Sequence, residues 1–514
     1  MSDDGLRVRG GTGGTTVGLA ALEAASGRLR DAAEDVAASL GRTLLVAADP
    51  GLACVAPSVV TAAAAEAALA LAAGPGGLAG DAARLAALAT ATTTTVTAYR
   101  AAEVEVARTL AFTQDAVMFV VGRQAPEVVV GVLALDALGV DLGGVLDRAL
   151  WEAPALADLA GGADGLVAGL RTDPRTAPLL APGVAANPKR SSGPRTYEDA
   201  LEVLADSAAV LGLLDDRGGV QVRAEPVARS GAVAPRSLED LVRDQGNLGD
   251  AEHYPGHVRV VEVPTASGRA WLVEVSGTQV WDPRAGTNPF DATTDVRAMA
   301  QESTVLARGV QQALEQAQAE SRAASTRAGT ATDPPGEPVS ASSPASSAVV
   351  DDPGRDTTAE PVMVVGHSLG GIVVAGLASS PGFTARHRVT HVVTIGSPVA
   401  RMPVPASVQV LSLEHRQDPV PRLEGAPNPD RAGWVTATRD LDDGRREGTG
   451  SEAHGVGEYA LTAGAVDRSS DPSLVTWRDG SEAFFTPAPG VEPVVRDYRI
   501  ARVVPSSLVA QSGP

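Results

Sequence analysis

One short segment, Gly366-His367-Ser368-Leu369-Gly370, restricts the fold of this chain more than any other feature. It follows the largely β-branched run Val362–Val365 and precedes an apolar run that favours a helix. A Gly-X-Ser-X-Gly pattern between a strand and a helix is typical of a sharp turn that projects its serine from the edge of a sheet. Residues around such a turn must be small because the backbone doubles back on itself. Glycines stand at 366, 370 and 371, and the pattern therefore predicts Ser368 as a nucleophile.

A serine hydroxyl is a weak nucleophile without a base, and in this arrangement the chain order is serine, acid, histidine. Five of the seven histidines are unsuitable, because they precede the serine, lie inside the motif or follow it too closely: His253, His257, His367, His387 and His391. Two remain. His415 lies on or beside a predicted strand, whereas His454 lies in a loop after the last predicted strands. His454 is therefore the preferred base, with His415 as the alternative.

The acid is expected at the end of a strand between the nucleophile and the base. Asp418 follows the strand-like run VQVLSLEHRQ directly and precedes Pro419, which stops strand pairing. Its distance along the chain from Ser368 and from His454 leaves room for one or two strand–helix units on either side. Four other carboxylates compete for this role: Asp430, Asp440, Asp442 and Asp443.

Three segments carry a resemblance to a known family: VMVVGHSLGGIVV, VVTIGSPV and HRQDPVPRL. They resemble parts of fungal-type (class 3) lipases and of related actinobacterial serine esterases in the α/β-hydrolase superfamily. The resemblance covers roughly residues 257–465, and it implies that Ser368, Asp418 and His454 are nucleophile, acid and base.

The same resemblance implies an oxyanion hole. The segment VEVSGTQVW is similar to the family's strand that ends in Arg-Gly-Thr, whose threonine donates a hydrogen bond to the oxyanion; here Ser276 stands where arginine is usual. Thr278 is accordingly expected to be one donor. The backbone N–H of Leu369, at the start of the helix that follows the nucleophile, is expected to be the other.

The fold expected around this site is an α/β hydrolase with a mostly parallel, doubly wound sheet. Apolar strands alternate with helices after residue 361, as in a sheet covered on both faces. Before them, HVRVVEV and AWLVEV predict two strands joined by a hairpin-like turn, and a long helix is expected from about Asp295 to Ala324. From Thr16 to Arg171 apolar residues recur at helical spacing, which predicts an all-α antiparallel bundle ahead of the hydrolase.

These patterns divide the chain into parts. Residues 1–195 are expected to form the helical domain and a linker, residues 196–324 and 361–500 the α/β-hydrolase domain, and residues 501–514 a tail. The stretch 325–360 is rich in Ser, Pro and Ala without apolar periodicity, which predicts a disordered insertion. The helical domain contains no histidine and resembles, without a clear Trp-X-Gly turn, the helical hairpins of actinobacterial type VII secretion substrates.

Charge and composition restrict the partners. A net charge of −20 repels phosphate backbones and anionic headgroups, so no nucleic-acid partner is expected. The single cysteine, Cys54, excludes an intrachain disulfide and a multi-thiolate metal site, and the predicted chemistry needs no cofactor or metal. The N-terminal residues lack a signal-peptide pattern, and no uncharged run reaches the ~18 residues of a membrane span. We therefore expect a cytoplasmic protein without a transmembrane segment, with leaderless export as an alternative.

The function predicted from these features is serine-dependent hydrolysis of carboxylic esters through an acyl-enzyme, with a small-molecule or lipid ester as substrate. A thioesterase or acyltransferase could use the same triad. A secretion-linked interaction protein with a vestigial hydrolase is the alternative from another class. In that case the N-terminal helices would mediate self-association or bind a protein partner.

Overall fold

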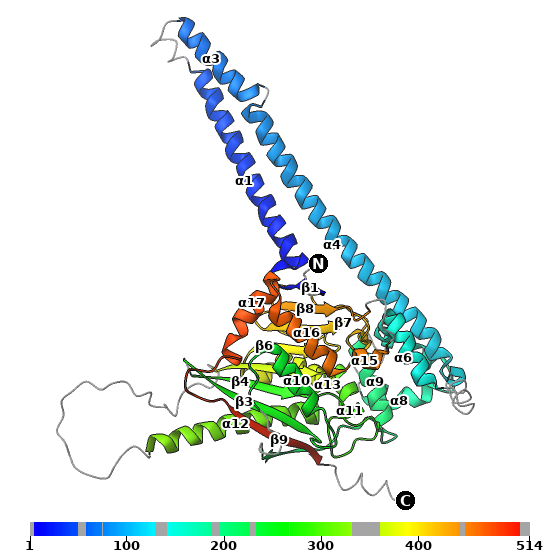
Figure 1. The fold of residues 1–514 in the computed structure, drawn as a ribbon. Coiled ribbons are helices and arrows are strands. Elements are labelled where there is room, and N and C mark those ends of the chain that lie inside the picture. Colours follow the sequence, from blue (N-terminus) through cyan, green and yellow to red (C-terminus); the bar gives the residue numbers. More distant parts are fainter. Residues whose placement is uncertain are drawn as a thin grey trace, which may run out of the picture. The chain divides into compact units, whose positions relative to one another are not determined.

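The computed structural model describes residues 5–49, 58–74, 76–128, 141–186, 196–226, 233–266, 268–330, 360–442 and 448–503. The chain divides into two compact units (Figure 1). The larger unit comprises Met1–Thr12 and Ala111–Pro514, and the smaller unit comprises Gly13–Leu110.

The larger unit is built on a nine-stranded sheet with the order β1-β8-β7-β6-β5-β4-β3-β9-β2. Its strands are β1 (Leu6–Gly10), β2 (Gly219–Glu225), β3 (His257–Thr265), β4 (Gly268–Val275), β5 (Pro361–His367), β6 (Arg388–Ile395), β7 (Gln409–His415), β8 (Trp434–Arg439) and β9 (Val494–Val503). The neighbours from β4 to β8 pair in parallel, whereas β1, β2, β3 and β9 pair antiparallel. The parallel centre agrees with the alternation of strands and helices in the sequence, and β3 and β4 form the expected hairpin.

Both faces of the sheet are covered by helices, which is why its strands are almost continuously apolar. On β4, Trp271 and Val273 point to one face and Leu272 to the other. The first face packs against α11 (Ala292–Met299), α12 (Val305–Thr330) and α13 (Leu369–Ser379). The second face packs against α10 (Leu238–Leu248), α16 (Val456–Arg468) and α17 (Pro472–Ser481). The sheet is therefore doubly covered, as the sequence predicts.

A cluster of helices N-terminal to the sheet region also belongs to the larger unit. It contains α6 (Leu142–Glu152), η2 (Pro154–Gly162), α7 (Ala163–Thr172), α8 (Ala177–Ala186) and α9 (Tyr197–Ala209). Val167, Leu180 and Val203 share one small core. The Tyr197 hydroxyl donates to the carbonyl oxygen of Leu423 (3.1 Å), so this cluster is joined to the loop after β7.

The predicted boundary at residue 195 therefore differs from the division in the structure. Strand β1 pairs with β8, and residues from Ala111 onward pack with the sheet unit. The physical reason is that short helices of residues 142–186 bury their apolar sides against α9, in one small core within the sheet unit. The remaining short elements of this unit are η1 (Gly11–Gly13), α14 (Pro381–Thr384), η6 (Val420–Arg422), α15 (Gly450–Ala453) and η7 (Glu482–Phe484).

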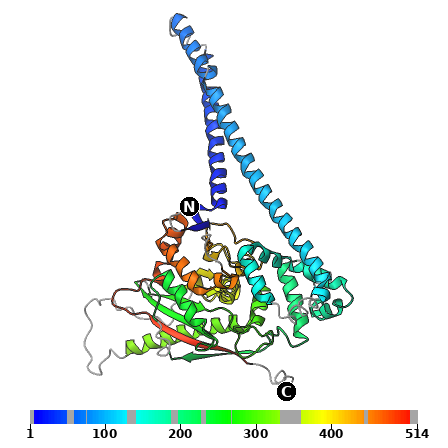
Figure 2. The same ribbon diagram turned by 45° about the vertical axis from the view of Figure 1, so that its right-hand side comes forward.

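The smaller unit is a long helical hairpin rather than the expected bundle. It contains α1 (Thr15–Ala47), α3 (Ser58–Ala73) and the part of α4 (Leu78–Arg123) that ends at Leu110, and α3 lies at its tip (Figure 2). The Ser26 hydroxyl of α1 donates to the carbonyl oxygen of Ala89 on α4 (2.8 Å). Two antiparallel helices cannot enclose a core, and the described buried side chains of this unit are few: Ser26, Ala33, Ala72, Ala89 and Val96.

Three further predictions change in the structure. The single helix expected from Asp295 to Ala324 is two helices, α11 and α12, because Gln301 between them adopts a left-handed backbone conformation (φ 60°) that ends a right-handed helix. Helix α12 continues to Thr330, and the rest of the expected insertion, 331–359, lies outside the described residues. Strand β9 extends to Val503, so the described part of the expected tail is strand.

The sequence predicts no membrane-spanning segment, but the structure contains one helical stretch that could span a membrane. In the described part of the chain, the helical stretch Val59–Arg123 is long and apolar enough to cross a membrane by length and composition alone. The absence of a transmembrane segment therefore stays a prediction.

Candidate active site

Ser368 occupies the turn between β5 and α13, with φ 53° and ψ −121°. A positive φ is strained for a residue with a side chain, and such strain persists only where the surrounding structure holds it. Here the Ser368 N–H donates to the carbonyl oxygen of Ile395 on the neighbouring strand β6 (2.9 Å). Within the described residues only Leu214 and Gln301 share a positive φ without being glycine. The strand–turn–helix setting expected for a nucleophile is therefore present.

The glycines of the motif are required by close backbone contacts. A Cβ on Gly366 would collide with the backbone of Gly370, and a Cβ on Gly370 would collide with the backbone of Val275. These neighbours are main-chain atoms inside the sheet unit, so they cannot move aside as a flexible side chain could. The small residues predicted at this turn are thus a steric requirement of the observed backbone.

The predicted acid and base lie in contact. His454 follows α15 directly, and its Nδ1 is 2.8 Å from Oδ2 of Asp418, which lies in the loop after β7. Asp418 is completely buried, and it also accepts hydrogen bonds from the Tyr459 hydroxyl (2.6 Å) and the Val420 N–H (2.9 Å). Three donors therefore fix this carboxylate, and Nε2 is the histidine nitrogen left for a nucleophile.

The base also borders the serine turn. The ring of His367, the residue before Ser368, lies 4.7 Å from the ring of His454, and its Nε2 donates to the His454 carbonyl oxygen (3.0 Å). The structure thus brings Ser368, His454 and Asp418 together at the carboxyl ends of β5 and β7, where ligands bind in open α/β sheets.

The alternative base, His415, is fully engaged elsewhere. Its Nδ1 bonds the Ala453 carbonyl oxygen (2.7 Å), its Nε2 bonds the Thr462 hydroxyl (2.7 Å), and its ring stacks on Tyr459 at 3.8 Å. Burial lowers the pKa of His415 to about 4, so the imidazole is neutral. With both nitrogens occupied, His415 cannot deprotonate Ser368.

The rival acids are also placed elsewhere. Asp440 pairs with Arg416 (2.8 Å) and accepts from the Gln417 amide (2.6 Å). Among the described residues, Asp418 is the carboxylate that hydrogen-bonds the His454 ring, so Asp430 and Asp442 are not its partners. Asp443 lies outside the described residues.

Two histidines for which no structural role was predicted hold the backbone around the predicted base, His454. His367 bonds the carbonyl oxygen of His454, and His415 bonds that of the preceding Ala453. Burial lowers the pKa of His367 to about 3, so it too is neutral. No sequence pattern marks this arrangement, because its two histidines come from different strands.

The expected oxyanion donors lie at the same place. Leu369 is the first residue of α13, and an N–H in the first turn has no partner within its helix. A Cβ on Gly277 would stand 3.1 Å from Cβ of Ser368, so the Gly277-Thr278 segment passes directly beside Ser368. The Thr278 hydroxyl donates to Oδ2 of Asp295 at the start of α11 (2.9 Å).

Asp295 borders the candidate site through Thr278 and was not predicted from the sequence. Burial raises its pKa to about 7, nearby Asp291 adds to this rise, and His454 opposes it. An ionised Asp295 takes the single proton of the Thr278 hydroxyl, whereas a protonated Asp295 can donate to Thr278 and leave that hydroxyl free to donate. In the sequence, the nearby Asp291 caps the start of α11. Such a pattern indicates where a helix begins and does not indicate a functional site.

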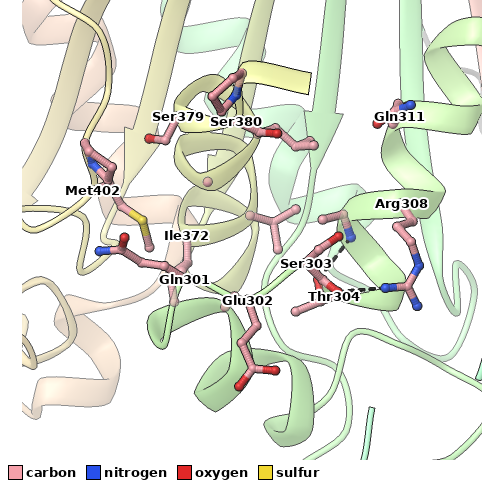
Figure 3. Close-up of a pocket in the computed structure, with 17 residues that line it drawn as sticks. Gln301, Glu302, Ser303, Thr304, Arg308, Gln311, Ile372, Ser379, Ser380 and Met402 are labelled. Carbon is pink, nitrogen blue, oxygen red and sulfur yellow. Dashed lines mark hydrogen bonds between the residues drawn. The ribbon is translucent and has the colours of Figure 1, made fainter. Parts of the chain in front are cut away.

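A cavity of about 320 Å³ lies farther along α13 (Figure 3). Ile372 and Met402 line it together with Gln301 and Thr304 from the segment between α11 and α12, and Gln301 lies beside Met402. None of Ser368, Asp418 and His454 lines it. Among the described residues, no group of three or more His, Cys, Asp or Glu side chains could hold a metal ion.

Comparison with known proteins gives one match, at this site. Residues 353–456 match the family model of the PGAP1-like alpha/beta domain, and the match includes Ser368, Asp418 and His454. That family is of the α/β-hydrolase type. The PGAP1-like match identifies a hydrolase family for about a fifth of the chain, rather than the fungal lipases that the motifs resemble. No curated protein and no solved structure matches the chain.

Proposed function

We propose that this protein hydrolyses carboxylic esters through an acyl-enzyme formed on Ser368. The observation that carries the proposal is the 2.8 Å hydrogen bond between His454 and buried Asp418, beside a serine held at a strained turn. A carboxylate on Nδ1 fixes the tautomer in which Nε2 accepts a proton, and this is the state that a serine nucleophile needs.

The reaction begins with proton transfer from the Ser368 hydroxyl to Nε2 of His454 as Oγ bonds to the ester carbonyl carbon. The carbonyl oxygen becomes an oxyanion, and the Leu369 N–H and the Thr278 hydroxyl donate to it. His454 then gives its proton to the leaving alcohol oxygen, the ester C–O bond breaks, and the acyl group remains on Ser368. Asp418 stabilises the transient imidazolium throughout.

The second half returns the enzyme to its starting state. Water gives a proton to His454 and attacks the acyl carbon, and the carboxylic acid leaves as Ser368 recovers its proton. The triad leaves the acyl chain undefined, and the resemblance of three segments to class 3 lipases supports a lipid or small-molecule ester. Competition among water, an alcohol and a thiol as acceptors distinguishes hydrolysis from acyl transfer.

A fluorophosphonate probe tests the nucleophile. We expect the wild-type protein to be labelled covalently and the Ser368→Ala variant to remain unlabelled. Ser380→Ala, at the opposite end of α13, is the matched control and should be labelled as the wild type is. A wild-type protein that resists the probe, or labelling that survives in Ser368→Ala, would exclude an acyl-enzyme on Ser368.

A further inference from the structure

The smaller unit has a tip with almost no charge. Charged residues recur along α1 up to Arg42 and along α4 from Asp81 onward. Between them, residues 43–80 contain only two, Asp49 and Glu66. We call the described residues of this stretch, 43–49, 58–74 and 76–80, the hairpin tip. From this distribution of charge and the exposure of its side chains we propose that the tip inserts into the apolar interior of a lipid bilayer.

The apolar side chains of the tip face outward. The large hydrophobic residues that are exposed there are Leu44, Leu45, Val46, Val59, Val60, Leu69 and Leu71. In water the exposed side of a surface helix is normally polar, and a helix that is apolar all round belongs in a protein core or in lipid. Helix α3 has no polar stripe along its length. Among its described side chains, only that of Ala72 is buried.

Lipid fits this distribution better than a protein partner does. Each helical residue turns by about 100°, so Val60 and Leu69 project to opposite sides of α3, and both are exposed. A protein partner covers one side of a helix and leaves a polar side to water, as in an amphipathic interface. Acyl chains can surround the helix on every side that α1 leaves open, so one environment satisfies all the exposed residues.

Length and charge set the depth of insertion. The 16 residues of α3 extend about 24 Å, which is less than the hydrocarbon thickness of about 30 Å. The charged parts of α1 and α4 both begin at the base of the tip, at Arg42 and Asp81, so the tip enters and leaves on the same side. The chain is acidic, with a net charge of −20, so hydrophobic transfer and not attraction to anionic headgroups drives insertion.

Flotation with vesicles of pure phosphatidylcholine tests this directly. We expect the full chain to float with the vesicles, equally at low and high salt. Val59→Asp combined with Leu71→Asp should lower the bound fraction at least tenfold. The matched control is Val104→Asp combined with Val106→Asp, at exposed positions in the charged part of α4, which should bind as the wild type does. Glu66→Gln, which removes the only charge on α3, should raise the bound fraction.

Two further measurements separate this proposal from the alternatives. Ser368→Ala should float as the wild type does, because binding through the tip needs no acyl transfer; loss of flotation there would assign binding to the proposed ester site. An environment-sensitive fluorophore on the thiol of Leu71→Cys, at an exposed position of α3, combined with Cys54→Ser to remove the native cysteine, should shift to the blue with vesicles.

The proposal is overturned if the wild-type protein stays in the dense bottom fraction of the gradient. It is also overturned if the tip variant and its α4 control lose binding equally. Sedimentation equilibrium without lipid covers the remaining case. If the chain forms a dimer that Val59→Asp with Leu71→Asp abolishes and does not float, the tip is a surface for a second copy and not for lipid.

Discussion

The serine turn is closely packed, whereas the side chains of the helical hairpin are mostly exposed. At the turn, a Cβ on Gly366 or Gly370 would collide with backbone, and buried Asp418 accepts hydrogen bonds from three donors. In the hairpin, Gly27 has open space where a side chain would be, and most side chains face outward. Packed surroundings can hold a strained or charged group in one geometry, whereas an open helix cannot. Chemistry is therefore expected at the turn and surface binding along the hairpin.

The largest expected effect is on catalysis at Asp418. Asp418→Asn keeps the size of the side chain but can offer an N–H to His454 and stabilise the wrong tautomer, so kcat should fall about 10⁴-fold. Asp35→Asn, at an exposed position of α1, should leave kcat unchanged. Ester hydrolysis under saturating substrate measures both. Equal activity of the two variants would show that Asp418 does not orient the base.

Glycine substitution should give stability changes of opposite sign in the two regions. Gly370→Ala places a Cβ against the backbone of Val275, and we expect it to destabilise the larger unit by about 3 kcal/mol or more. Gly27→Ala lies within α1, where nothing stands within 4 Å of the new Cβ, and it should stabilise the hairpin by about 0.5–1 kcal/mol. Thermal unfolding of each variant tests this. A neutral Gly370→Ala would mean that the turn tolerates a wider backbone than the structure has.

The titration of Asp295 should appear in the pH profile. Below its pKa of about 7 the acid carries a proton and leaves the Thr278 hydroxyl free for the oxyanion, while above it the carboxylate engages that hydroxyl. We therefore expect kcat to fall about tenfold between pH 6 and pH 8.5 as one oxyanion donor is lost. Asp295→Asn should remove this fall, because its amide can donate to Thr278 at every pH. An identical fall in Asp295→Asn would assign it to another group.

Sequence reasoning predicted the local part of this architecture and missed the parts that depend on distant contacts. The strand, turn and helix around Ser368 lie in one continuous segment, so their pattern can be recognised there. His454 was preferred over His415 by chain order, whereas the structural reason against His415, its two occupied nitrogens, comes from tertiary contacts. Strand β1 could not be found, because Leu6–Gly10 becomes a strand only by pairing with β8, more than 400 residues away.

Asp295 and the two backbone-holding histidines were missed for the same reason. Asp295 lies partly buried beside Thr278 only because the start of α11 lies near the end of β4, and in the sequence it is one acidic residue among many. The helical bundle was predicted from periodicity, which indicates an apolar face but not what covers it. In the described hairpin, α1 and α4 bury only part of each other's apolar residues. Helical periodicity of apolar residues is therefore compatible with a two-helix hairpin as well as with a closed bundle.

The smallest expected effect separates support from catalysis at the buried acid. Tyr459 donates to the Asp418 oxygen that also bonds His454, and Tyr459→Phe removes one of three donors while the other two still hold the carboxylate. A lost hydrogen bond of about 1 kcal/mol corresponds to roughly a fivefold fall in kcat. Because Tyr459 is fully buried and its hydroxyl bonds Asp418, we expect no change in KM. Tyr99→Phe, at an exposed position of α4, should have no effect on either constant. A fall as large as that of Asp418→Asn would mean that the hydroxyl, and not the backbone N–H of Val420, sets the position of the acid.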